Sequence, residues 1–237
     1  MKILKQSPTL KEQFLKTVEQ KVSLKREAVQ DKLGRGFLGA IGAGIFEFQQ
    51  IKNAVKGNLG ENYVAFLAGF LPDSWIMFKN ALIPTLTEKL TEIDILLVGP
   101  SGVFLIEVKT WKGSFSAYRD KWKRREGNNW IPLEDSPTEQ SLYHQKMFHR
   151  WVNSKITGLP KELITAPVVF PVAQWLGIKE CSVPVFQEVK ELKLFLNQRA
   201  VCLTSEQVFQ IGEAIENFVV EEPSNSSKAK PILRKSF

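Results

Sequence analysis

Residues 92–109 read EIDILLV-GPSG-VFLIEVK, two apolar runs separated by a four-residue turn sequence. Each run has the length and apolar composition of a buried β-strand, and the glycines and proline between them indicate a tight turn. Side chains alternate between the two faces of a strand, so Glu107 and Lys109 are expected on one face and their apolar neighbours on the other. A charge inside an apolar strand is costly unless it is paired or binds a metal. We therefore interpret Asp94, Glu107 and Lys109 as parts of a functional site.

Length and composition are those of one globular domain with extensions. The chain has 237 residues and is 43% hydrophobic, which is enough to bury one full core. It contains no apolar run of about 18 residues that would form a membrane-spanning helix, and residues 1–6 lack the apolar stretch of a secretory signal. Cys181 and Cys202 lack metal-ligand spacing and are expected to be reduced thiols. The sequence therefore predicts a cytoplasmic protein, with peripheral contact to a membrane left open.

Positive charge is concentrated at the periphery of the sequence. The formal net charge is +7, and residues 1–35, 119–126 and 223–237 carry local charges of +5, +3 and +4. The remainder of the chain therefore carries −5. Basic extensions around a mildly acidic body suit the binding of a polyanion around a site that itself holds cations. Ordinary solvated charge is the alternative interpretation of each segment.

Three regions are expected along the chain. Residues 1–50 are predicted to form a basic helical extension that ends in a glycine-rich apolar segment, Gly36–Phe46. That segment is too short to span a bilayer. The alternatives are packing on the body or on a partner, contact with a membrane surface, and a flexible apolar connector. Residues 51–220 are predicted to form the main domain, and residues 221–237 a disordered basic tail.

Helices and strands alternate in the main domain, which indicates an α/β fold. Ser136 followed by proline is typical of a helix start, and Thr204 to Gln207 has the form of a capping box. Helices are predicted at 9–32, 57–71, 136–155, 188–196 and 204–220, strands at 75–82, 92–98, 103–109, 114–118, 121–125, 166–172, 182–186 and 200–203, and a loop at 128–132.

One further carboxylate, Glu61, follows a Gly-x-x-Gly sequence at the start of a predicted helix. If Glu61, Asp94 and Glu107 converge within about 4 Å, they repel one another by roughly 1–4 kcal/mol per pair. A divalent cation removes that repulsion, and oxygen ligands select Mg²⁺ or Mn²⁺ over zinc. Such an ion lowers the pKa of a bound water, and Lys109 could orient that water and stabilise the transition state.

These motifs together resemble the NERD family, the nuclease-related domain. The resemblance rests on Gly57-x-x-Gly60-Glu61, on Glu92-Ile93-Asp94, and on the run from Val98 through Glu107-Val108-Lys109 to Trp111-Lys112-Gly113. It covers residues 55–155 in detail and extends toward 220. NERD is similar to the PD-(D/E)xK nucleases, so the resemblance implies a restriction-endonuclease-like core, a mixed β-sheet flanked by helices, with the N-terminal helical extension outside it.

The resemblance also implies roles for individual residues. The implied metal ligands are Glu61, Asp94, Glu107 and the carbonyl of Val108, with Lys109 as the catalytic lysine and Gln140 beside the active site. The sequence departs from the family pattern in two places. Ile93, not proline, precedes Asp94, and Ile95 stands where the family often has histidine.

Each candidate also has a structural interpretation. Glu61 suits a helix N-terminus, where a carboxylate contributes about 0.3–1 kcal/mol. Glu107 and Lys109 suit an ion pair at a sheet edge, and Gln140 suits an ordinary helix face. Asp94 is the hardest to explain in this way, because acids are depleted in strands. A second pair of polar residues, His144 and His149, is five apart and lacks metal-ligand spacing, so both are expected to be solvated or at the edge of the core.

The predicted hairpin at 114–125 interleaves basic and aromatic residues. Such a surface could bind a phosphate backbone and stack bases. In the alternative, an ordinary two-stranded ribbon, strand alternation turns about half of the aromatics toward the core. The candidate nucleic-acid-binding residues are Lys112, Arg119, Lys121, Lys123, Arg124 and Arg125, among the aromatics Trp111, Tyr118, Trp122 and Trp130.

The sequence therefore predicts a Mg²⁺- or Mn²⁺-dependent nuclease that hydrolyses phosphodiester bonds, with DNA as the expected substrate. A nucleic-acid-binding module that keeps the fold without turnover is one alternative. A membrane-associated module that uses Gly36–Phe46 is the other.

Overall fold

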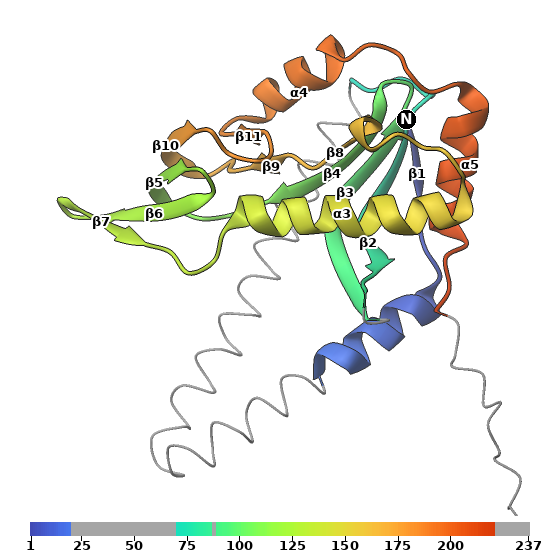
Figure 1. Cartoon of the computed structure of the whole chain (residues 1–237), viewed down its shortest axis with the longest axis horizontal. Coiled ribbons are helices and arrows are strands. Elements are labelled where there is room, and N and C mark those ends of the chain that lie inside the picture. Colours follow the sequence, from blue (N-terminus) through green and yellow to red (C-terminus); the bar gives the residue numbers. More distant parts are fainter. Residues whose placement is uncertain (20–69, 87–88, 221–237) are drawn as a thin grey trace, which may run out of the picture.

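The computed structural model describes residues 1–19, 70–86 and 89–220 (Figure 1). The predictions for Glu61, the helix at 57–71, the Gly36–Phe46 segment and the C-terminal tail lie outside the described residues. Residues 8–19 are helical, as expected for the start of the N-terminal extension. Leu10 of this helix is 2% exposed and joins the main core. In the described part of the chain, no helix has the length and apolar character needed to cross a membrane.

A mixed seven-stranded sheet forms the centre of the molecule. Its order is β1-β2-β3-β4-β9-β11, and β8 also pairs with β4. The β2-β3 and β3-β4 pairs are antiparallel, whereas β1-β2, β4-β8, β4-β9 and β9-β11 are parallel. The strands are β1 (Lys2–Leu4), β2 (Ile76–Pro84), β3 (Leu90–Gly99), β4 (Gly102–Val108), β8 (Ile164–Thr165), β9 (Val168–Val169) and β11 (Val185–Phe186).

A second sheet of four strands follows β4 along the chain. Its order is β10-β5-β6-β7, with β10 parallel to β5 and the other pairs antiparallel. Phe115, Trp122 and Phe170 form a separate core cluster beneath it. The strands are β5 (Gly113–Tyr118), β6 (Lys121–Glu126), β7 (Asn129–Pro132) and β10 (Ala173–Lys179).

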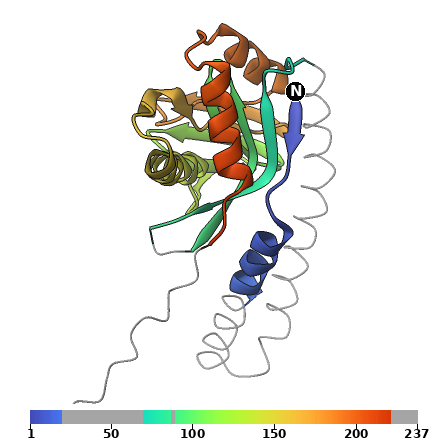
Figure 2. The ribbon, with the colours of Figure 1, turned by 90° about the vertical axis from the view of Figure 1, so that its right-hand side faces the viewer.

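Three longer helices cover the first sheet, and their starts follow the expected capping chemistry. In α3 (Pro137–Lys155), the Ser136 hydroxyl accepts a hydrogen bond from the Glu139 N–H at 3.2 Å. A capping box of Thr204 and Gln207 begins α5 (Ser205–Glu216). Both helices pack on one face of the first sheet (Figure 2), whereas α4 (Val189–Gln198) packs on the other. A short 3₁₀ turn, η1 (Lys161–Leu163), precedes β8.

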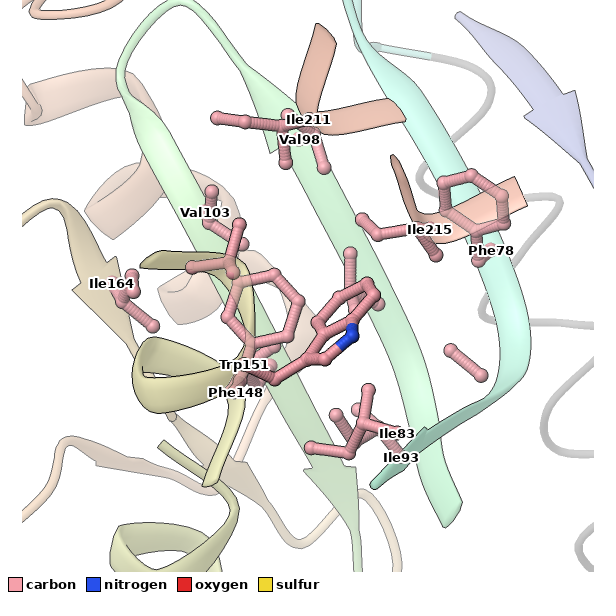
Figure 3. Close-up of a cluster of buried hydrophobic side chains, with 14 of the residues drawn as sticks. Phe78, Ile83, Ile93, Val98, Val103, Phe148, Trp151, Ile164, Ile211 and Ile215 are labelled. Atoms are coloured by element: carbon pink, nitrogen blue, oxygen red, sulfur yellow. The ribbon is translucent and has the colours of Figure 1, made fainter. Parts of the chain in front are cut away.

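Strand alternation separates two apolar clusters on the two faces of this sheet. The cluster under α3 and α5 includes Val98 and Val103, which pair across β3 and β4, and the α3 residue Phe148 (Figure 3). The cluster under α4 contains Phe104 and Ile106. Fully burying a side chain of this size contributes roughly 1.5–3 kcal/mol. This two-sided burial confirms an α/β fold of mixed sheets flanked by helices.

Several predicted boundaries are wrong at the second sheet and near the C-terminus. The expected loop at 128–132 is strand β7, because the chain reverses at Gly127, whose φ of 58° favours glycine. Of the expected strand at 166–172 only Val168–Val169 is a strand, and β10 begins just after it. Residues 200–203 form no strand, and α5 ends at Glu216.

Candidate active site

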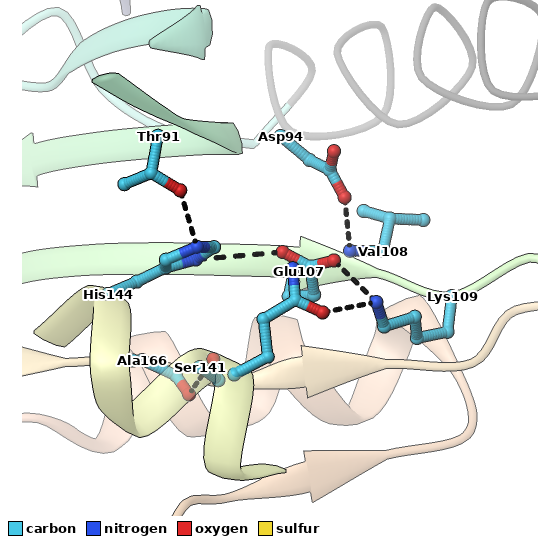
Figure 4. Close-up of polar contacts among 9 residues, drawn as sticks. Thr91, Asp94, Glu107, Val108, Lys109, Ser141, His144 and Ala166 are labelled. Carbon is cyan, nitrogen blue, oxygen red and sulfur yellow. Dashed lines mark hydrogen bonds and ion pairs between the residues drawn. The ribbon is translucent and has the colours of Figure 1, made fainter. Parts of the chain in front are cut away.

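Glu107, near the C-terminal end of β4, and Lys109, the residue that follows the strand, lie beside the first turns of α3 (Figure 4). Alternation along β4 places Glu107 and Lys109 on the same face as Val103 and Leu105, which pack toward α3. Glu107 is 3% exposed and Lys109 is 8% exposed. Two opposite charges are therefore buried together where an apolar strand meets a helix.

The Lys109 ammonium is held by two oxygen acceptors. Its Nζ donates to Glu107 Oε1 at 2.7 Å and to Gln140 Oε1 at 2.8 Å. It also lies 5.9 Å from the centre of the Trp111 ring. A buried ion pair gains little net stability over an apolar pair of the same size, because both charges lose their hydration. Stability alone is therefore a weak explanation for this pair.

Asp94 reaches the same strand end from β3. The last residues paired between β3 and β4 are Ile95 and Ile106, and one step further on Asp94 Oδ2 accepts the N–H of Val108 at 2.8 Å. This hydrogen bond fixes the backbone between Glu107 and Lys109. Asp94 is half-buried. The structure thus brings together Asp94, Glu107, Val108, Lys109 and Gln140, five of the six residues predicted for the active site.

His144 is a member of this cluster that the sequence interpretation placed wrongly. It was expected to be solvated or at the edge of the core, but it is 4% exposed. Its Nδ1 lies 3.8 Å from Glu107 Oε2, and its Nε2 lies 3.1 Å from Thr91 Oγ1. Helical spacing is the signal that predicts this burial, because His144 shares the sheet-facing side of α3 with Phe148 and Trp151. The other histidine, His149, is half-buried.

Two buried hydroxyls fix the start of α3 over the site. Thr138 Oγ1 accepts from Trp122 Nε1 at 3.0 Å, which ties α3 to the second sheet. Ser141 Oγ donates to the Ala166 carbonyl at 2.8 Å, which ties α3 to the segment before β9. Both side chains are fully buried and flank Gln140 in the sequence. They hold in place the backbone that carries Gln140, and neither was predicted from the sequence.

The donor set at the strand end fits a hard cation. Asp94, Glu107 and the Val108 carbonyl offer only oxygen, which suits Mg²⁺ or Mn²⁺. Across residues 1–19, 70–86 and 89–220, no three His, Cys, Asp or Glu side chains form a group able to hold a metal. The third predicted carboxylate, Glu61, lies outside these ranges. The described residues thus offer two carboxylates and one carbonyl at this strand end.

The predicted nucleic-acid-binding residues divide between two faces of the second sheet. Lys121, Lys123 and Arg125 alternate with Trp122, which is 2% exposed and faces the core. Arg124 lies on the core-facing side of β6 and pairs with Glu126. The remaining two lie outside the strands, Arg119 at the β5-β6 turn, where it pairs with Glu180 at 2.9 Å, and Lys112 just before β5.

The fold and the site define an α/β domain with a buried acid–lysine pair at the end of a central strand. A family model for NERD, the nuclease-related domain, matches residues 56–171. This segment is therefore a nuclease-related domain, and it spans Glu61, Asp94, Glu107, Lys109 and Gln140. A search of curated proteins found no match, and neither did a search of solved structures.

Proposed function

We propose that this protein is a metal-dependent nuclease that hydrolyses phosphodiester bonds, with DNA as the expected substrate. The observation that carries the proposal is the buried Lys109 ammonium, which lies between Glu107 and Gln140 at 2.7 and 2.8 Å. A lysine held in this way offers a fixed positive charge at the end of a strand. The nuclease-related domain match over residues 56–171 supports the same class of activity.

Asp94, Glu107, the Val108 carbonyl and Glu61 would hold Mg²⁺ or Mn²⁺ at this site. When bound, such an ion lowers the pKa of a coordinated water and neutralises charge that develops on a phosphoryl oxygen. The Asp94–Val108 hydrogen bond keeps two of these donors in register with each other. Ligands that are positioned before substrate arrives need no rearrangement during the reaction.

Lys109 would act on the attacking water and on the phosphate. Its ammonium can donate a hydrogen bond that orients the water. As this water attacks phosphorus, the bond to the leaving oxygen breaks, the water gives up a proton to solvent and the leaving oxygen takes one up from solvent. Positive charge fixed at this point stabilises the negative charge that increases on the phosphoryl oxygens. Gln140 keeps the ammonium in place through its Oε1 atom. Gln140 is thus a positioning residue for Lys109.

A plasmid-cleavage assay tests the proposal. The full chain with Mg²⁺ or Mn²⁺ should nick supercoiled plasmid, and EDTA should stop the reaction. Lys109→Ala should lower the rate by roughly 10²-fold or more, the usual effect of removing a group that stabilises the transition state. Lys146→Ala removes the same charge from an exposed position of α3 and should keep the activity. Cleavage that survives Lys109→Ala would contradict the assignment.

Nucleic-acid binding without turnover is the second candidate function. It is favoured by the basic, exposed strand β6, which needs no metal to bind a polyanion. A module of this kind would bind nucleic acid with strong salt dependence, would be indifferent to EDTA, and would leave plasmid intact under all conditions. The membrane-associated alternative rests on Gly36–Phe46, outside the described residues, and liposome co-sedimentation of the full chain against one starting near Ala54 tests it.

A further inference from the structure

The four-stranded sheet has one covered face and one open face. Phe115, Ala117 and Trp122 point into the core on the covered side, and Leu176 and Ile178 of β10 pack against the same cluster. Because side chains alternate, the residues between them point outward. The open face therefore carries the alternate residues of β5, β6, β7 and β10.

Those outward positions have an unusual composition. The register aligns Gly177, Ser116, Lys123 and Pro132 in one row across the sheet, and it pairs Arg125 with Trp130. None of the outward positions on these four described strands is an acid. We call this surface the Trp–Lys face, and its defining residues are Tyr118, Lys121, Lys123, Arg125, Trp130, Trp175 and Lys179.

The far end of the Trp175 indole lies over Gly177 on the Trp–Lys face. A Cβ placed on Gly177 would come within 2.1 Å of the Trp175 ring, so the indole occupies the space that a side chain at 177 would fill. That end of the ring is therefore against the strand, while Trp175 remains 49% exposed. Trp130, 36% exposed, lies beside it with ring centres 5.8 Å apart and ring planes inclined by 50°. The two neighbouring indoles form a platform of two inclined, partly exposed rings on which flat groups can stack.

Cations lie around Tyr118, which is on the same face. Tyr118 is 47% exposed, with the Arg119 guanidinium 5.0 Å and the Lys179 ammonium 5.8 Å from its ring centre. A shallow hollow of about 460 Å³ lies between Tyr118, Lys121, Lys123 and Lys179. A ligand that fits here has flat apolar groups and regularly spaced negative charges.

We propose that the Trp–Lys face binds single-stranded nucleic acid. Unpaired bases expose their ring faces, which stack on tryptophan regardless of sequence, while lysines and arginine contact the phosphates. In a duplex the base faces are already stacked on one another, so only the phosphates and the base edges in the grooves remain available, and the indoles have no ring face to stack on. A membrane surface would use the same cations, but it offers no planar rings. As a substrate class, single-stranded nucleic acid rests on the proposed nuclease function. Binding to the Trp–Lys face itself requires no cleavage.

Fluorescence anisotropy of a labelled oligothymidylate tests the proposal with the full chain in EDTA. The catalytic variant Lys109→Ala is measured in parallel, so that a failure of catalysis is distinguished from a failure of binding. The stacking variants are Trp175→Ala and Trp130→Ala, and Trp175→Phe keeps a stacking ring. Phe209→Ala on α5 is the control, because this aromatic is also exposed, at 52%, but lies on another element.

Wild type and Lys109→Ala should bind the oligonucleotide equally. Each tryptophan-to-alanine change should weaken binding roughly tenfold, with most of the affinity kept by Trp175→Phe and all of it by Phe209→Ala. With four phosphate contacts, an increase in salt from about 50 to about 200 mM should weaken binding on the order of 50-fold.

Three outcomes would overturn the proposal. One is a duplex of the same length that competes as well as the single strand. Another is undiminished affinity in the Trp130→Ala Trp175→Ala double variant. The third is binding to anionic phosphatidylserine vesicles but not to the oligonucleotide. Plasmid cleavage by Lys109→Ala would instead contradict the nuclease proposal and leave this one unaffected.

Discussion

Strands β4 and β6 place charge in opposite environments. All seven residues of β4 are buried, including Glu107, whereas Trp122 alone is buried among the six residues of β6. Helices cover both faces of the first sheet, but the second sheet has a core on one face and an open surface on the other. A charge in β4 is costly and must be paired, while a charge in β6 is solvated at little cost.

This difference matches the two proposed functions, hydrolysis at the first sheet and nucleic-acid binding at the second. The buried sheet fixes a few polar groups at defined distances, as chemistry requires. The open sheet presents many cations and aromatic rings to solvent, as binding requires. Two hydrogen bonds tie the start of α3, which covers the first sheet, to the second sheet. Trp122 Nε1 donates to Thr138 Oγ1 at 3.0 Å, and Ser136 Oγ donates to the Asp120 carbonyl at 2.9 Å.

The largest contrast should appear in side-chain truncation. Phe148 is 0% exposed in the core of the first sheet. Phe148→Ala should therefore lower the free energy of unfolding of the protein by roughly 3–5 kcal/mol. Trp175→Ala on the open face should cost about 1 kcal/mol or less, because half of that side chain is already solvated. Urea unfolding monitored by circular dichroism measures both. Similar losses in the two variants would contradict the contrast between the sheets.

The buried ion pair should respond differently to single and double replacement. Lys109→Met removes the ammonium that contacts Glu107 and should cost roughly 3–5 kcal/mol. The double variant Glu107→Gln Lys109→Met removes both charges and should return to within about 1 kcal/mol of wild type.

Thermal unfolding in EDTA measures the series, and plasmid cleavage should be lost in both variants. A double variant as unstable as the single one would show that the pair contributes mainly to folding.

Much of this architecture was predictable because the signals are local. The two runs at 92–109 and the Ser136-Pro137 start of α3 contain their own strand, turn and capping chemistry. Strand β10 was not predicted, although Leu176 and Ile178 alternate with outward residues; it pairs with β5, which is distant in the sequence. The contact of Gln140 with Lys109 depends on how α3 crosses β4, which no local pattern encodes. Helical spacing could have predicted the burial of His144, but its approach to Glu107 depends on the same crossing.

A smaller effect is expected where α3 begins. Ser136→Ala removes the cap that accepts from Glu139 N–H and should cost about 1 kcal/mol. Because the same turn carries Gln140, the cleavage rate should fall as well. Thr204→Ala removes the equivalent cap of α5 and is the matched control, with a similar loss of stability but unchanged cleavage. If Ser136→Ala and Thr204→Ala lower the cleavage rate equally, the turn that carries Gln140 does not orient Lys109.

The smallest effect is expected at the exposed pair Arg119–Glu180. Its atoms lie 2.9 Å apart, but both side chains are largely solvated, so Glu180→Gln should change stability by less than about 1 kcal/mol. The same change removes an acid beside the Trp–Lys face and should strengthen oligonucleotide binding a few-fold at low salt. Anisotropy titrations at two salt concentrations measure this, and weaker binding in the variant would contradict the electrostatic account.

We propose that Asp94 and Glu107 hold a divalent ion beside Lys109. A crystal of the full chain soaked in Mn²⁺, with the ion located by its anomalous scattering, tests this proposal. A peak is expected between the carboxylates of Asp94 and Glu107, close to the Val108 carbonyl, and it should be lost in Asp94→Asn. A protein that cleaves plasmid with Mn²⁺ but shows no peak at this position would contradict it.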